Sequence, residues 1–381
     1  MIYLDHAAAT PVSSRVLEAM KPYFLHDFFN PSAAYLPAKK VASEYEAAKA
    51  TIAHAIGAKA SDLVITAGAT EANNLAFTSL SADANATSAK VLYLVTEHDS
   101  VRRVAERCGG VAVKVLPSGM IDLDNLRSKI TDSTELISVS LANNELGTIQ
   151  PLAEIATIIR EVKIDRMKRG IKRQLLLHSD ASQALNLLDI NVARLGVDLL
   201  TLNAAKIYGP KGVGALYVSH DAKLRPLTVG GGQENGLRSG TENVPGVIGF
   251  AKAVELAKEH INGNRKKYAT WRKILLDGLT GCEAINKKHA LDNFVVICYN
   301  GTDAERLVFL LEEKGVYVAT GAACAASKGV RSHVLSAIGL SESQIAGSLR
   351  LTLGETNDEA QIRDAVNIIN EVVAKEQERV K

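Results

Sequence analysis

The sequence predicts an α/β protein in which a mostly parallel sheet of seven strands forms a large domain and a smaller α+β domain follows. Short apolar runs alternate with segments long enough for helices, which is typical of parallel strands joined by crossover helices. The chain has 381 residues, of which 47% are hydrophobic, so it can form two domains with substantial cores. A glycine-rich segment at residues 230–240 then breaks the alternation. The expected strands are Leu63–Thr66, Val91–Thr96, Val111–Leu116, Leu136–Leu141, Leu175–His178, Leu199–Leu202 and Ala215–Val218.

Helices are expected on either side of these strands. Residues Ser32–Ile56 carry apolar side chains every three or four positions and end at Gly57, which predicts a long helix. Residues Glu154–Arg169 place isoleucines and a valine on one face and charges on the other, as a crossover helix does. After the glycine-rich segment we expect a helix over Val247–Leu279, strands at Phe294–Tyr299 and Val316–Ala319, and helices at Ala304–Lys314 and Glu359–Lys375. We predict a large domain of residues 14–255 and a small domain of residues 1–13 and 256–381.

Composition and charge argue against several classes of partner. The formal net charge is +2 and the basic residues are scattered, so neither nucleic acid nor a membrane surface is expected as a direct partner. The segment Met1–His6 has no basic or apolar targeting pattern, and no apolar run approaches the length that crosses a bilayer. We therefore expect a cytoplasmic protein with a small-molecule substrate and protein partners.

The four cysteines, Cys108, Cys282, Cys298 and Cys324, lie far apart and form no CxxC pair. Neither a zinc site nor a disulfide framework is therefore expected, and no metal is assigned. Cys282 and Cys298 lie in or near apolar segments, where a buried structural thiol is the more common case.

Ligands of α/β sheets bind at the carboxyl ends of strands, so the residues that follow each apolar run are candidates for a site. Gly68, Ala69 and Thr70 form a turn of small residues that leads into a helix. Bare backbone N–H groups there, with the Thr70 hydroxyl, can bind a phosphate, although an ordinary helix cap explains the pattern equally well. His98 could stack on a cofactor ring or be structural, and Asn144 could bond a cofactor or belong to a polar turn.

Asp180 and Lys206 follow two further strands and are informative as a pair. Pyridoxal phosphate (PLP) acts as an electron sink when its pyridine nitrogen stays protonated, which a buried carboxylate enforces. A partly desolvated lysine amine binds the cofactor and later moves protons. Each residue alone is more often structural, but together they indicate a PLP enzyme.

Three motifs make the chain recognisable: Gly68–Glu71, Lys206–Gly212 and Gly230–Gly246. Together they resemble the cysteine desulfurases, which are class V, fold type I PLP-dependent transferases. The resemblance extends from Leu4 to Gly354, with the motifs in the family's order. It implies a PLP-dependent conversion of L-cysteine to L-alanine, with the sulfur passed on to an acceptor.

The resemblance also implies a role for each cofactor residue. Lys206 would hold PLP covalently through its amine, and Asp180 would pair with the ring nitrogen. Gln183 would bond the ring hydroxyl, while His98 would stack on the ring and exchange protons with the substrate. Further cofactor contacts are implied for Gly68, Ala69, Thr70, Asn144, Asn203 and, from the opposite subunit of a homodimer, Thr241.

On the substrate side, Arg350 and Asn144 match the positions that hold the carboxylate, and Asn30 matches a further substrate position. Arg350 suits this role because its planar fork can donate to two oxygens at once. Cys324 lies among small residues and would be the nucleophile that takes the sulfur as a persulfide. Its segment resembles that of the housekeeping, iron–sulfur-cluster type, so an iron–sulfur scaffold or a tRNA-thiolation protein is the expected acceptor.

The chain departs from the family pattern in its polar residues. Relatives commonly have Ser-Gly-His before the lysine, where this sequence has Asn203, Ala204 and Ala205. Ala205 cannot donate to the phosphate, which predicts weaker cofactor binding. Two alternatives remain open: a selenocysteine lyase or another class V amino-acid lyase or aminotransferase, and a low-activity homologue that acts as a sulfur-transfer scaffold.

Overall fold

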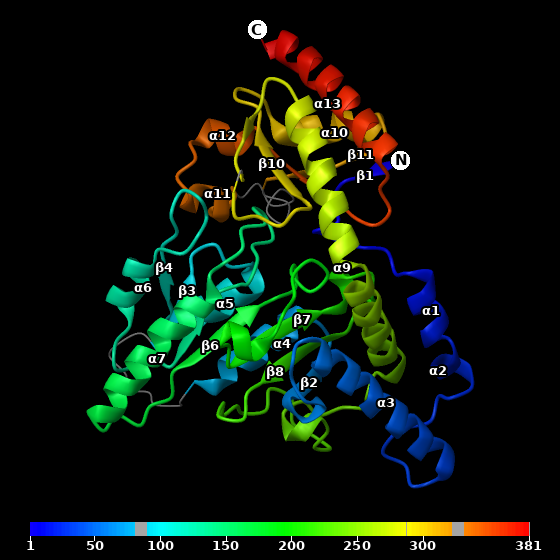
Figure 1. The fold of residues 1–381 in the computed structure, drawn as a ribbon, viewed down its shortest axis with the longest axis vertical. Helices are drawn as coiled ribbons and strands as arrows, with labels where there is room; N and C mark the ends of the chain where they lie inside the picture. Colours follow the sequence, from blue (N-terminus) through cyan, green and yellow to red (C-terminus); the bar gives the residue numbers. More distant parts are fainter. Residues whose placement is uncertain (81–89, 287, 322–330, 381) are drawn as a thin grey trace.

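The computed structural model describes residues 1–80, 90–286, 288–321 and 331–380. Cys324, the predicted nucleophile, lies outside these described residues. The predicted α/β class is confirmed. A large sheet with helices around it occupies the lower part of Figure 1, and a smaller group of strands and helices lies above it.

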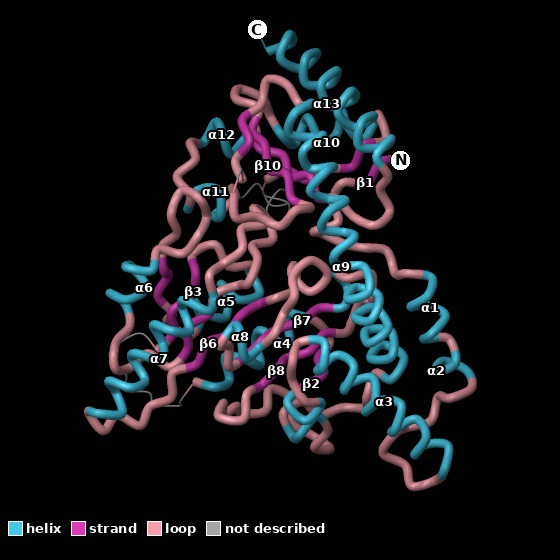
Figure 2. Tube along the Cα trace, in the orientation of Figure 1, coloured by secondary structure: helices cyan, strands magenta, loops and turns pink. Residues whose placement is uncertain are grey.

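The large sheet has seven strands in the order β2-β8-β7-β6-β5-β3-β4. β8 runs antiparallel to both of its neighbours, and the other pairings are parallel, as predicted. Strands β2, β3, β5 and β6 are buried along their whole length, because helices cover both faces of the sheet (Figure 2). The strands are β2 (Leu63–Thr66), β3 (Val91–Leu94), β4 (Val111–Val113), β5 (Leu136–Ser138), β6 (Leu176–Asp180), β7 (Leu199–Asn203) and β8 (Gly214–Val218).

The helices of this part also follow the sequence pattern. The long helix α3 (Leu36–Ala55) begins later than predicted, because Pro37 lies in its first turn and Tyr35 before it is extended. The crossover helix predicted at Glu154–Arg169 is α7 (Leu152–Lys168). The other helices are α1 (Ser14–Met20), α2 (Pro22–Leu25), α4 (Ala69–Ala76), α5 (Asp99–Arg107), α6 (Leu123–Lys129) and α8 (Val192–Leu195).

The upper part contains a four-stranded sheet, β12-β13-β10-β9, and a two-stranded sheet, β1-β11. The strand predicted at Val316–Ala319 is divided between the two sheets as β11 (Val316–Tyr317) and β12 (Ala319–Thr320). The remaining strands are β1 (Ile2–Tyr3), β9 (Glu283–Ala284), β10 (Phe294–Cys298) and β13 (Ser348–Thr352), and the helices are α10 (Ala304–Glu313), α11 (His333–Ala337), α12 (Glu342–Ala346) and α13 (Glu359–Val380).

The helix α9 (Val244–Gly278) connects the two parts, running from beside the large sheet up to β10 and α13 (Figure 1). The predicted domain division after residue 255 falls inside this continuous helix and stays a prediction. β1, in the N-terminal segment, pairs in parallel with β11 of the upper part. Among the described residues, no helix is both long and apolar enough to cross a membrane.

Candidate active site

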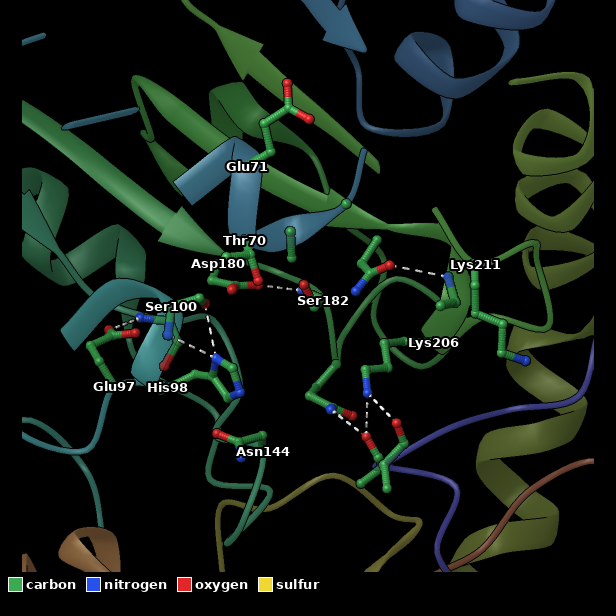
Figure 3. A pocket seen from close by; sticks show the side chains of 18 of the residues that line it. Thr70, Glu71, Glu97, His98, Ser100, Asn144, Asp180, Ser182, Lys206 and Lys211 are labelled. Carbon is green, nitrogen blue, oxygen red and sulfur yellow. Dashed lines mark hydrogen bonds between the residues drawn. The ribbon is translucent and has the colours of Figure 1, made fainter. Parts of the chain in front are cut away.

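A cavity lies at the carboxyl ends of the strands in the large sheet. Its volume of about 830 Å³ is typical of small-molecule sites. Strands β2, β3, β5, β6 and β7 all point toward this edge, so the polar residues that follow them meet there (Figure 3). Ten of the residues predicted from the sequence line the cavity: Gly68, Ala69, Thr70, His98, Asn144, Asp180, Gln183, Asn203, Lys206 and Arg350.

One end of the cavity is formed by the turn before α4. Gly68 precedes this helix with φ 144°, a backbone conformation that favours glycine, and the N-cap position therefore has no side chain to bond the first helical N–H groups. The Cα of Gly68 also lies 2.8 Å from the point where a side chain on Gly214 would begin. The ordinary side-chain cap considered from the sequence is therefore absent at Gly68, and the open N–H groups suit an anion.

Asp180 ends β6, and its carboxylate is held from two sides. Asn73 Nδ2 donates to Oδ2 over 2.8 Å, and the backbone N–H of Ser182 donates to Oδ1 over 2.9 Å. Only 8% of the residue is exposed. A fixed, buried carboxylate at this place is what a protonated pyridine nitrogen requires.

Lys206 lies in the short turn after β7, beneath the N-terminal segment. Its Nζ donates to the carbonyl oxygens of Ala7 over 2.9 Å and Ala8 over 2.5 Å. Gln183 Nε2 donates to the same Ala7 oxygen over 3.0 Å. The hydroxyl of Thr10 donates to the Ala205 carbonyl, so the N-terminal segment fixes the lysine turn. The sequence patterns gave no indication of this contact.

His98 is the N-cap of α5 and lies in the cavity wall (Figure 3). Its Nδ1 accepts from the backbone N–H of Ser100 over 3.1 Å and lies 2.9 Å from the Ser100 hydroxyl oxygen. His98 therefore has a structural role, as one of the two interpretations of the sequence predicts, because its ring caps a helix. It does not exclude the functional role, since Nε2 takes no part in the cap.

Arg350, in β13 of the four-stranded sheet, lines the cavity and is 2% exposed. Its Nη2 pairs with Asp5 Oδ1 over 2.7 Å, and its Nη1 donates to the Asn144 carbonyl over 2.9 Å. Nε has no hydrogen-bond partner among the described residues. The predicted pair of Arg350 and Asn144 is thus brought together, through the Asn144 backbone, and Asp5 is a charge partner that the sequence did not indicate.

Two buried acids lie next to predicted site residues. Burial raises the pKa of Glu97 well above its usual value, although the Ser140 N–H donates to its Oε1 over 2.6 Å and lowers the pKa. Burial likewise raises the pKa of Glu145 to about 7, against the opposing effects of the Ser332 hydroxyl and Arg350. Burial thus favours the uncharged form of Glu97, which lines the cavity together with Asp5 and Asp180.

Two predicted residues lie away from this cavity. Thr241 and Asn30 are exposed and do not line the cavity, and the Asn30 side chain accepts from the Ser32 N–H over 2.9 Å. The contact expected for Thr241 is with the site of an opposite subunit. Both assignments stay predictions.

The groups that line the cavity fit PLP. Three groups line one space: a turn with open N–H groups at Gly68–Thr70, a buried carboxylate at Asp180 and an amine at Lys206. These are the groups that the phosphate, ring nitrogen and aldehyde of PLP require. The Ser182 hydroxyl, also on the wall, has no partner within the described part of the chain. Ala205 lines the cavity as well and offers only a methyl group to a phosphate.

Comparison with known proteins agrees with this geometry. The family model for aminotransferase class V matches residues 2–364. The cysteine desulfurase IscS of Methanosarcina thermophila is 38% identical, with 98% of this chain and 92% of the relative covered. The cysteine desulfurase IscS 1 of Archaeoglobus fulgidus is 37% identical, with 98% and 97% covered.

Solved structures similar to this chain include proteins of the same kind. A NifS-like protein superposes with a TM-score of 0.89 at 30% identity, covering 98% of this chain and 99% of that one. The structure described as SspA in complex with cysteine has a TM-score of 0.80 at 32% identity, covering 93% and 99%.

Proposed function

The chain belongs to the class V aminotransferase family and, within it, to the cysteine desulfurases, and on that premise we propose that its cavity binds PLP and removes sulfur from L-cysteine. The NifS-like fold agrees with the fold type I architecture expected from the sequence. The observation that carries the proposal is the convergence of Lys206, Asp180 and Arg350 on one cavity. Asp180 ends β6 and Lys206 lies in the turn after β7, whereas Arg350 comes from β13, more than 140 residues further along the chain.

Each of these groups has a distinct task in the proposed reaction. PLP, when bound, withdraws electrons from the substrate Cα. Asp180 keeps the proton on the ring nitrogen, Lys206 holds the cofactor and moves a proton at Nζ, and His98 exchanges a second proton. Arg350 binds the substrate carboxylate with the N–H groups that Asp5 and Asn144 leave open.

Cys324 is proposed to complete the reaction as a thiolate. It attacks the substrate sulfur, so that an S–S bond forms while the substrate C–S bond breaks. The electron pair of the broken bond stays on the substrate carbon, which takes up a proton, and alanine leaves. The sulfur remains on Cys324 as a persulfide until an acceptor thiol takes it.

A substrate panel tests this reaction against the alternatives. Purified protein with PLP and a thiol reductant is expected to form alanine and sulfide in equal amounts from L-cysteine. Selenide from L-selenocysteine at a much higher kcat/KM than sulfide from L-cysteine would identify a selenocysteine lyase. Amino-group transfer to a keto acid without sulfide would identify an aminotransferase, and no turnover of any substrate would favour the scaffold.

We also propose a homodimer, because the chain exposes a cluster of large apolar side chains. Leu25, Phe28 and Leu36 are 75%, 65% and 80% exposed, and Phe28 and Tyr35 both contact the ring of Phe29. Contiguous exposed apolar patches mark interaction sites. Asn30 lies within this segment, which supports a subunit contact that also contributes to the site.

Light scattering tests the dimer. The double variant Leu25→Glu/Leu36→Glu is expected to have about half the wild-type mass in solution, because burying two carboxylates opposes association. Met167→Glu is the matched control, since Met167 is 72% exposed but lies on α7, on the other side of the molecule (Figure 1). A monomeric wild type, or a double variant that remains dimeric, would contradict the proposal.

The alanine at position 205 leads to a further prediction. Ala205→His is expected to tighten PLP binding, because a charge-assisted hydrogen bond to the phosphate contributes about 1.5–3 kcal/mol, or roughly 10–150-fold in Kd. The Kd is measured by titrating apoprotein with PLP and following absorbance. Ala205→Leu, which adds bulk without a donor, is the control and is expected not to tighten binding. An unchanged Kd in Ala205→His would show that the phosphate lies elsewhere.

The sulfur acceptor is proposed to be a protein thiol, of an iron–sulfur scaffold or a tRNA-thiolation protein. The name IscS, carried by the relatives, supports the first of these. A cytoplasmic location is part of the proposal, because a persulfide-forming cysteine works best where thiols stay reduced. The described cysteines, Cys108, Cys282 and Cys298, are free thiols.

A further inference from the structure

Asn73 connects two parts of the cavity wall. This residue lies on α4, one helical turn after Thr70, and is fully buried. Its single amide nitrogen, Nδ2, lies 2.8 Å from Asp180 Oδ2 and 2.8 Å from the Ser100 hydroxyl oxygen. Ser100 in turn contacts His98. A continuous chain of hydrogen bonds therefore joins the carboxylate for the ring nitrogen to the histidine for proton exchange.

Asp180 sets the donor-to-acceptor direction of these hydrogen bonds. An ionised carboxylate only accepts hydrogen bonds, so the Asn73 side chain must turn its NH₂ group toward Asp180. The NH₂ group has two protons, and the second points to the Ser100 oxygen. Asn73 is therefore a donor to both neighbours, while its Oδ1 has no partner among the residues described.

The hydroxyl of Ser100 follows from the orientation of Asn73. Because its oxygen accepts from Asn73, its own proton is available for His98 Nδ1, which lies 2.9 Å away. The backbone N–H of Ser100 donates to the same Nδ1. Nδ1 thus accepts two hydrogen bonds and cannot carry the proton of the neutral ring. That proton is on Nε2, the ring nitrogen that faces the cavity (Figure 3).

We propose that Asn73 is a positioning residue: through Ser100 it fixes His98 as the Nε2–H tautomer, so that proton exchange takes place at Nε2. The inference rests on the proposed role of His98 and goes further, since it assigns the reacting atom and the residues that select it. Asn73 and Ser100 touch neither the substrate nor the reacting atoms in this account. They act through His98 and Asp180.

The test is the tautomer of His98, read by long-range ¹H–¹⁵N NMR of the full-length holoenzyme with ring-labelled histidine. The His98 signals are identified as those lost in His98→Gln. In the wild type, Nδ1 is expected to resonate as an unprotonated nitrogen and Nε2 as a protonated one. A wild-type ring protonated at Nδ1 would overturn the proposal.

Asn73→Leu tests the link between Asn73 and the tautomer. Leucine has a similar size but no N–H, so the Ser100 oxygen loses the donor that directs its own proton toward Nδ1. The tautomer is then no longer fixed, and the His98 Nδ1 signal should shift toward the protonated position; Asn73→Leu signals identical to the wild type would overturn the proposal. Asn74→Leu is the matched control, because it removes the same amide one position along α4, where that amide donates to the Thr70 carbonyl. It should leave the tautomer unchanged, and a control that shifts Nδ1 equally would overturn the proposal too.

Ser100→Thr and Ser100→Ala separate the hydroxyl from the backbone cap. The threonine variant retains the hydroxyl and is expected to reproduce the wild-type spectrum. The alanine variant loses one of the two donors, so the Nδ1 signal should move while staying unprotonated; no movement would show that the hydroxyl makes no contact and would overturn the proposal. Because these spectra need no turnover, they fail or succeed independently of whether L-cysteine is the substrate.

Discussion

Lys206→Ala is expected to lose both the visible absorbance band of lysine-bound PLP and all formation of alanine from L-cysteine. In the proposed mechanism the amine that holds the cofactor also moves a proton, and the loss of general acid–base catalysis alone lowers rates by about 10²–10⁴-fold. In the structure, Lys206 is held by the carbonyls of Ala7 and Ala8 at the wall of the cavity. The measurements are an absorbance spectrum after PLP addition and an alanine assay.

Lys211→Ala is the matched control for the absorbance. Lys211 lines the same cavity from five positions further along the chain, but its Nζ donates to the Thr10 carbonyl. The band is expected to survive this change. If the band persisted in Lys206→Ala and disappeared in Lys211→Ala, Lys211 and not Lys206 would hold the cofactor.

Cys324→Ser is expected to reduce sulfide release to the level of a protein-free control while the absorbance band of bound PLP stays in place. A serine hydroxyl is not ionised at neutral pH and does not replace a thiolate as a nucleophile toward sulfur. Sulfide and the spectrum are measured on the same sample, so that loss of chemistry is separated from loss of cofactor.

Cys108→Ser is the corresponding control, since Cys108 is an exposed free thiol at the end of α5. It is expected to release sulfide at the wild-type rate. Full sulfide release by Cys324→Ser, or its loss in Cys108→Ser alone, would show that another thiol carries the sulfur.

Much of the fold could be predicted because its strands are local patterns. The run Leu63–Thr66 is β2 with the same bounds, since an apolar stretch between turns is a buried parallel strand. The prediction of a single strand at Val316–Ala319 is wrong. Its first half pairs with β1 and its second half with β13, and this choice depends on segments far away in the sequence.

The candidate site is predicted from local patterns in a similar way. Asp180, His98 and Asn144 are candidates because each follows an apolar run and the carboxyl ends of parallel strands meet at one edge, and all three line the cavity. Asp5 could not be found in this way, because its partner Arg350 lies 345 residues further along the chain. Asn73 was similarly hidden, since its contact with Asp180 spans 107 residues. Only the packed fold brings such pairs together.

The pairing of Arg350 with Asp5 also bears on how the substrate is held. A buried guanidinium needs a counter-charge, and Asp5 provides one over 2.7 Å. In the proposed reaction, the amino-acid carboxylate would therefore meet an arginine that is already oriented and partly neutralised. The N-terminal segment thus contributes to the site twice, through Asp5 at Arg350 and through Ala7 and Ala8 at Lys206.

The most direct test of the central claim is mass spectrometry of the holoenzyme after a single addition of L-cysteine without reductant. The account predicts one additional sulfur atom on the peptide that contains Cys324 and one alanine released per sulfur bound. Alanine formed without sulfur on that peptide, or pyruvate and free sulfide in place of alanine, would contradict it.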